Sequence, residues 1–148
     1  MGNSILIALN DSVSSRAALS FFARLSLCPD DSEITLLHIL RKPTATEELM
    51  GKKFTAEQPA RFQALLDKAK ERLVESGYHP ERIETLLVTD PYPTVAAAII
   101  DQCRRRHYDM VIIGRKRMTK AEEFVMGDVS VKLLREMEKM AILVVRSD

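Results

Sequence analysis

Residues Ser4–Leu9 have the sequence SILIAL. The run is apolar at consecutive positions rather than at alternate ones, which is typical of a strand whose two faces are both buried in a parallel sheet. Asn10–Ser12 end the run and offer side chains that can cap a helix. An amphipathic helical spacing follows at Ala18, Phe21, Phe22 and Leu25. The chain therefore opens with a buried strand and a helix that covers it.

The same order of strand and helix recurs to the end of the chain. Further strand-like runs occur at Glu33–Leu40, Ile83–Val88, Asp109–Ile113 and Met140–Val145. Helical apolar spacing lies between them at Phe62–Leu73, Val95–Cys103 and Val129–Met137. No linker or change of composition divides the sequence. We therefore predict one doubly wound α/β domain over residues 1–148, with a five-stranded parallel sheet and four helices on its two faces.

Arg41–Glu57 is the longest stretch without clear periodicity. Its charges are mixed, and it follows the carboxyl end of a strand, where binding loops gather. We expect it to be a mobile loop with at most a helical start, and to be the least ordered part of the chain.

Composition excludes several classes of protein. The chain has 148 residues, 22 Lys and Arg, 21 Asp and Glu, and a net charge of +1. This balance disfavours a nucleic-acid binder and an acidic disordered chain. The run Arg104–Arg106 with His107 fits a solvated helix end, where cations are favoured. No apolar run reaches the length of roughly 18 residues that a membrane span needs, so we expect no membrane partner.

The cysteines indicate a reducing compartment. Cys28 and Cys103 are far apart, and neither belongs to a CxxC pair, so a zinc site or redox dithiol has little support. We interpret both as small core residues. The amino terminus lacks a basic region followed by a cleavage site. Together these features lead us to expect a cytoplasmic protein without a metal site.

Familiar nucleotide motifs are absent from the sequence. The turn after Ser4–Leu9 has no glycine for a dinucleotide pyrophosphate, and no Gly-Lys-Ser/Thr triplet marks a P-loop. In open α/β sheets, ligands bind outside the carboxyl ends of strands, where strand order reverses. That rule directs attention to four places, namely Asn10–Ser12, Ile39–Arg41, Thr89–Pro93 and Gly114–Ser130.

Gly114–Ser130 is the most informative of these places. A strand runs into Gly114, and a loop then leads to Gly127 at the expected start of a helix. Exposed N–H groups at a helix start can bind an anion. The alternative is that Gly127 only permits a tight entry into the helix, which Asp128 or Ser130 then caps. The residues by themselves leave both interpretations open.

Three segments resemble the universal stress protein family. They are ILIALNDS at Ile5–Ser12, LLHIL at Leu36–Leu40 and DMVIIGRKRMTKAEEFVMGDVSVKLL at Asp109–Leu134. The resemblance covers nearly the whole chain and implies a flavodoxin-like fold with strand order 3-2-1-4-5. In members of this family that bind ATP, a glycine-rich loop wraps the triphosphate and ribose. An Asp after the first strand and an aliphatic residue of the second strand hold adenine.

The resemblance assigns candidate nucleotide-binding residues in this chain. Positions that match the family pattern are Ile39, Gly114, Gly127 and Ser130. Positions that depart from it are Asn10 for the adenine-side Asp, Arg117 for the second glycine of the loop, and Asp128 for the Ser or Thr after the third glycine. An Asn still offers adenine a hydrogen-bond donor and an acceptor. The departures at Arg117 and Asp128 concern the phosphates.

Asp128 opposes phosphate binding by its charge. A carboxylate about 5 Å from a phosphate charge costs roughly 3 kcal/mol at an effective dielectric constant near 20. The helix N-terminus offsets only about 0.3–2 kcal/mol. We therefore expect Asp128 to cap the helix and ATP to bind weakly or not at all. Mg²⁺ could reverse this by bridging Asp128 and the phosphates, and so could the nearby cations Arg115, Lys116, Arg117 and Lys120.

Three functions remain in competition. The first is a cytosolic stress-response or regulatory module with a weakened or lost ATP site. The second is a working ATP-binding member with slow hydrolysis or serine autophosphorylation, and the third is an interaction scaffold with a vestigial cleft. Ser12, Ser14 and Ser15 lie beside Asp11 at a helix start, where such residues are caps. His38 fits a structural core position. We name no catalytic residue and expect a binding module rather than an enzyme.

The last strand predicts a homodimer. Met140–Val145 is apolar throughout, and only three residues follow it. In the implied strand order it lies at the sheet edge, where unpaired N–H and C=O groups invite another chain. Family members that resemble this chain commonly dimerise through this strand. We expect two copies to pair Ile142–Val145 antiparallel about a two-fold axis.

Overall fold

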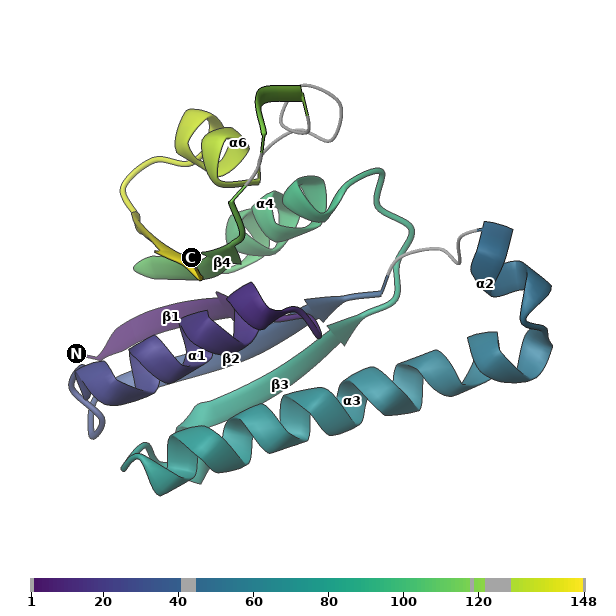
Figure 1. Ribbon diagram of the computed structural model, residues 1–148. Coiled ribbons are helices and arrows are strands. Elements are labelled where there is room, and N and C mark those ends of the chain that lie inside the picture. Colours follow the sequence, from purple (N-terminus) through teal and green to yellow (C-terminus); the bar gives the residue numbers. More distant parts are fainter. Residues whose placement is uncertain (1, 41–44, 118, 122–128, 148) are drawn as a thin grey trace.

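The structure, a computed structural model, describes residues 2–40, 45–117, 119–121 and 129–147. Parallel strands form one sheet in the order β3-β2-β1-β4-β5. Their bounds are β1 (Asn3–Ala8), β2 (Ser32–Ile39), β3 (Ile83–Val88), β4 (Met110–Arg115) and β5 (Ala141–Arg146). Figure 1 shows the sheet between two layers of helices. The predicted fold class and strand order are confirmed.

Each face of the sheet has its own hydrophobic core. α1 (Val13–Leu25) and α3 (Lys52–Glu75) cover one face, and α4 (Val95–Arg105) and α6 (Val129–Glu136) cover the other (Figure 1). In β1, Ile5 and Ile7 pack toward α1 and α3, whereas Leu6 packs toward α4 and α6. Because successive strand side chains point to opposite faces, this double burial explains why SILIAL is apolar at every position.

The order of the strands places a crevice at the end of β1. From β1 the chain crosses to β2 on one side, while β4 pairs with β1 on the other side. β1 reaches Ala8 beside Leu37 of β2, and its register with β4 extends to Ile7 beside Ile112. The connections that leave these strands diverge toward opposite faces of the sheet. The space between them is the place where such sheets bind ligands.

The prediction of a loop over Arg41–Glu57 is wrong for most of that stretch. Residues 41–44 lie outside the described part of the chain, but α2 (Ala45–Leu49) and the start of α3 at Lys52 are helical. Gly51, with a φ of 99°, separates the two helices. This stretch contains several Lys, Glu and Ala residues, which are good helix formers. It lacks apolar periodicity because these turns of α3 extend past the sheet (Figure 1).

The basic run at the end of α4 is neutralised by acidic partners. Arg104 lies 3.6 Å from Glu136, Arg105 lies 3.0 Å from Asp101, and Arg106 lies 3.1 Å from Glu84. These partly exposed ion pairs agree with the interpretation of a solvated helix end. In the described ranges, no helix combines the length and apolar character that crossing a bilayer requires.

The two cysteines differ, and the prediction that both are core residues is wrong for Cys28. Cys103 is buried on α4, whereas Cys28 is exposed after α1 with a φ of 43°. Its place in the helical spacing was misleading because α1 ends at Leu25. Burial raises the pKa of the Cys103 thiol to about 11.

We predict that a thiol reagent labels Cys28 in the folded protein and Cys103 only after unfolding. The reason is that reaction requires access and a thiolate, and Cys103 is deprived of both. Mass spectrometry after brief alkylation at pH 8 should show one adduct, and two adducts in denaturant. Cys28→Ser should abolish labelling under native conditions. Rapid labelling of Cys103 in the folded chain would contradict the packing of α4.

Candidate functional site

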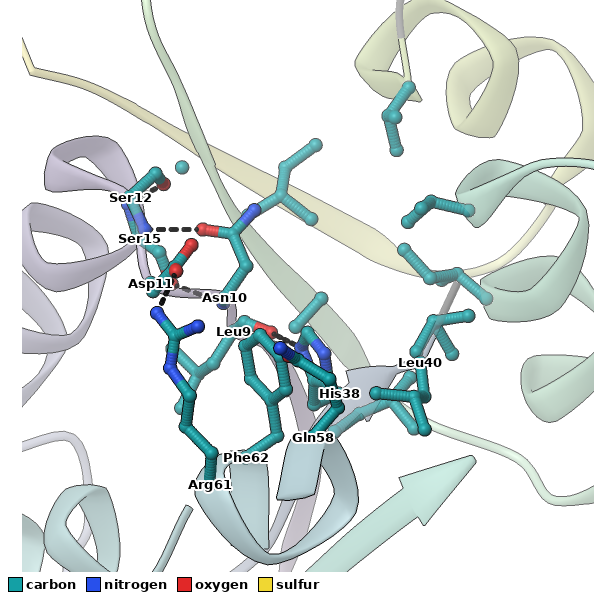
Figure 2. A pocket seen from close by; sticks show the side chains of 18 of the residues that line it. Leu9, Asn10, Asp11, Ser12, Ser15, His38, Leu40, Gln58, Arg61 and Phe62 are labelled. Atoms are coloured by element: carbon teal, nitrogen blue, oxygen red, sulfur yellow. Dashed lines mark hydrogen bonds and ion pairs between the residues drawn. The ribbon is translucent and has the colours of Figure 1, made fainter. Parts of the chain in front are cut away.

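A cavity of about 440 Å³ lies at the carboxyl ends of β1, β2 and β4. Its size is typical of small-molecule sites. Figure 2 shows it between the start of α1, the side of α3 and the apolar ends of the strands. Lining residues include Leu9, Asn10, Asp11, Ser12, Ser15, His38, Ile39, Leu40, Gln58, Arg61, Phe62, Val95, Ile99, Ile113 and Gly114. The position matches the crevice that strand order places at the end of β1.

Three of the candidate residues from the sequence meet at this cavity. Asn10, Ile39 and Gly114 come from three different strand ends and line the same space. Arg117 is exposed and is not among the lining residues. Ser130 is buried in α6, and it is its neighbour Val129 that reaches the cavity. The remaining two candidates, Gly127 and Asp128, lie outside the described residues.

Asn10 is engaged in the turn that starts α1. Its Oδ1 accepts a hydrogen bond from the Ser12 N–H at 2.9 Å, and its own N–H donates to the Ser15 Oγ at 2.9 Å. Ser12 in turn caps the helix, because its Oγ accepts from the Ser15 N–H at 3.1 Å. The serines on the cavity rim therefore stabilise the helix start, as the sequence predicted. A ligand that used the Asn10 carbonyl would compete with this turn.

Gly114 is needed for packing as well as for the cavity. A Cβ atom placed on it would lie 2.2 Å from the Ser14 carbonyl oxygen and 2.8 Å from the Ser15 nitrogen. Both are backbone atoms, so no side-chain rotation relieves the contact. β4 thus approaches the first turn of α1 so closely that only glycine fits. This role holds with or without a ligand, and the family resemblance does not reveal it.

His38 and Phe62 form a stacked pair on one wall of the cavity (Figure 2). The ring centroids are 3.9 Å apart and the planes are inclined by only 9°. The His38 Nδ1–H donates to the Leu9 carbonyl at 2.7 Å, since the carbonyl can only accept. Both contacts fit the structural role that the sequence suggested for His38. Its partnership with Phe62 was missed, because the apolar spacing placed Phe62 only in a general helix core.

An ion pair joins the turn before α1 to α3 beside the cavity. The Arg61 guanidinium lies 2.8 Å from the Asp11 carboxylate, and its central carbon lies 5.3 Å from the centre of the Phe62 ring. Figure 2 shows this pair at the rim, between the start of α1 and α3. Both side chains are about half exposed, at 55% and 54%, so the pair contributes at most about 1 kcal/mol to stability. The main effect of the pair is that it places one positive and one negative group at the entrance of the cavity.

The lining determines what the cavity can hold. Ile39, Leu40, Val95 and Ile99 supply an apolar wall, and the polar groups gather on the opposite side near Asn10 and α3. An apolar slot with a few polar groups at its edge suits a planar, partly polar molecule. Among the described residues, no cluster of three or more His, Cys, Asp or Glu side chains is placed to hold a metal ion.

Known structures of the same fold are numerous and distant in sequence. A universal stress protein in complex with cAMP matches with a TM-score of 0.69 and 14% identity, over 99% of this chain and 98% of that chain. A universal stress protein family protein from Arabidopsis thaliana with AMP bound matches with a TM-score of 0.68 and 18% identity, over 99% of this chain and 92% of that chain. A protein of the same family from Burkholderia pseudomallei matches with a TM-score of 0.64 and 19% identity, over 97% of this chain and 95% of that chain.

At such identities these structures establish the fold alone. A search of curated proteins finds no match. The family model described as the universal stress protein family matches residues 1–146, which is almost the entire chain. That match agrees with the strand order and with the three segments that first suggested the resemblance. The chain belongs to the universal stress protein family.

Proposed function

We propose that this chain is a cytosolic regulatory module of stress responses whose cavity binds an adenine nucleotide with a single phosphate, and whose site for a triphosphate is weakened. The observation that carries the proposal is the cavity itself, which lies at the strand switch point with an apolar wall and a polar rim. Proteins of the same fold have been crystallised with cAMP and with AMP. A base, a ribose and one phosphate suit a cavity of about 440 Å³.

Weak binding of ATP follows from charge. Asp11 places a carboxylate on the rim, and Arg61 already pairs with it. Asp128 adds a second carboxylate in the sequence segment that holds phosphates in ATP-binding members. A monophosphate brings fewer negative charges toward these groups than a triphosphate does. The repulsion therefore grows with each added phosphate.

We predict that AMP or cAMP binds to nucleotide-free protein at least tenfold more tightly than ATP with Mg²⁺. Isothermal titration calorimetry measures this directly. The double variant Asp128→Ser with Arg117→Gly should raise ATP affinity by roughly tenfold or more, because it removes the carboxylate that opposes the phosphates. Tight binding of ATP by the unmodified protein, at low micromolar concentration, would instead identify a working ATP-binding member.

A matched pair of variants places the ligand in the cavity. Thr55 lines the cavity from α3, whereas Glu57 is exposed on the same helix and is not among the lining residues. Thr55→Trp should fill the space and abolish binding, and Glu57→Trp should leave it unchanged. Absence of binding by every nucleotide tested would favour an interaction scaffold with a vestigial cleft.

A further inference from the structure

The extended start of α3 gives the cavity a wall that the sequence did not predict. Thr55, Gln58, Arg61 and Phe62 lie at successive turns along one side of the helix, and all four line the cavity. Three of them are engaged with protein groups. The Thr55 hydroxyl donates to the Gly51 carbonyl, Arg61 pairs with Asp11, and Phe62 stacks on His38.

Gln58 is different from its three neighbours. Its side chain is half-buried at the cavity wall, and no hydrogen bond joins its amide to any residue of the described ranges. A primary amide carries an acceptor oxygen and a donor nitrogen side by side. Among the side chains that line the cavity from α3, it alone is neutral and presents both groups at one end. Its hydrogen-bonding capacity is thus available to a molecule in the cavity.

The walls around Gln58 define how a planar ring would lie. Ile39 is the last residue of β2 and Leu40 follows it, whereas Val95 and Ile99 come from α4. The stack of His38 and Phe62 lies next to Gln58 on the α3 side (Figure 2). A flat heteroaromatic ring can place its faces against the apolar groups and its edge toward α3. The edge that meets Gln58 then has to offer one donor and one acceptor.

We propose that Gln58 selects the base of the bound nucleotide by pairing with the edge of adenine. The adenine edge carries the 6-amino donor beside a ring-nitrogen acceptor, and this is the pattern that a glutamine amide pairs with through two hydrogen bonds. The inference rests on the proposed binding of an adenine nucleotide, and it adds to that binding a specificity residue on α3. Neither the resemblance nor the strand-end rule points to this residue.

The test combines a change in the protein with the matching change in the ligand. AMP and purine riboside 5′-monophosphate differ only in the 6-amino group, and calorimetry gives the ratio of their dissociation constants. For the unmodified protein we expect AMP to bind about three- to tenfold more tightly, the value of one hydrogen bond. For Gln58→Met the two ligands should bind nearly alike, because the amino group loses its hydrogen bond to Gln58.

Two further variants make the outcome specific. Gln102→Met makes the same change on α4 away from the cavity and should preserve the AMP preference. Gln58→Glu offers acceptors only, so it should lose affinity for AMP and gain affinity for GMP, whose edge carries two donors. Circular dichroism checks that α3 stays helical, which Met and Glu both favour.

The possible failures can be distinguished from one another. If the unmodified protein binds neither AMP nor purine riboside 5′-monophosphate, the proposed function is wrong and the role of Gln58 falls with it. If both ligands bind and the ratio is the same in Gln58→Met as in the unmodified protein, the nucleotide function stands and the role of Gln58 is overturned.

Discussion

Light scattering on the purified protein should give twice the chain mass of 16.8 kDa. β5 is the last strand of the sheet and has a neighbour on one side only. Its four central side chains, Ile142–Val145, are half-buried, and the strand contains no Lys, Pro or bulge that would blunt the edge. Two copies that pair their β5 strands antiparallel would satisfy the unpaired backbone groups of both edges.

The register of β5 shows which residue to change. The Ala141 N–H donates to the Asp109 carbonyl and the Ser147 N–H donates to the Arg115 carbonyl, so alternate residues of β5 bond to β4. By this alternation the N–H groups of Ala141, Leu143, Val145 and Ser147 point toward β4. The N–H of Val144 therefore points away from β4, to the open edge of the sheet. Val144→Pro should remove a hydrogen bond of the dimer while it leaves the ladder to β4 intact, and the mass should halve.

Val145→Pro is the matched control for the dimer. Its N–H points toward β4 by the same alternation, so this change should destabilise the fold itself rather than only the assembly. A charge at Leu143 or Val145 is less informative, because both side chains also pack against the α1 side of the core. A monomer mass for the unmodified protein at tens of micromolar, or a folded Val144→Pro dimer, would refute pairing through β5.

Gly114→Ala should lower the free energy of unfolding by about 2–3 kcal/mol. The added methyl group meets the backbone of Ser14 at 2.2–2.4 Å, so β4 and the start of α1 must move apart. Separation of these elements also alters the cavity, because Gly114, Ser12 and Ser15 all line it. Urea unfolding followed by circular dichroism measures the change, and nucleotide affinity should fall in the same variant.

Gly51 provides the contrast to Gly114. No atom of the described residues lies within 4 Å of a Cβ atom built there, so the cost of Gly51→Ala arises from its backbone conformation, with a positive φ of 99°. Its φ of 99° and ψ of 169° form a conformation that is essentially restricted to glycine, so the cost is about 1–3 kcal/mol. A larger side chain should matter little at Gly51, whereas Gly114→Val should be clearly worse than Gly114→Ala. Equal behaviour of the two glycines would mean that the contact between β4 and α1 is looser than the structure shows.

The fold was predictable because its signal is local. Each strand is a short apolar run, each covering helix has an apolar stripe, and alternation of the two leaves few possible topologies. The prediction of a loop failed at α2 and at Lys52–Glu57, where α3 extends beyond the sheet and the sequence shows no apolar periodicity. The prediction that Cys28 is buried was also wrong. The helical spacing of apolar residues continues to Cys28 in the sequence, but α1 ends at Leu25.

The candidate site was predictable in location but not in detail. Parallel strands bring their carboxyl ends together, so Asn10, Ile39 and Gly114 could be placed at one edge without a structure. The Asp11–Arg61 ion pair joins residues 50 positions apart, and no local pattern encodes such a contact. The same holds for the stack of Phe62 on His38 and for the access of Gln58 to the cavity, which follow from how α3 crosses the sheet.

The unequal lengths of α3 and its strand give the molecule a gradient of local stability. The 24 residues of α3 span roughly 36 Å, whereas the six residues of β3 span roughly 20 Å. Near its end the helix is anchored by the buried Leu66 and Leu73. Its first turns lack that anchor, and Pro59 removes one hydrogen bond within them. Local opening of α3 is therefore least costly where the helix borders the cavity. A ligand bound in the cavity would reduce this opening, so the first turns of α3 would become more ordered.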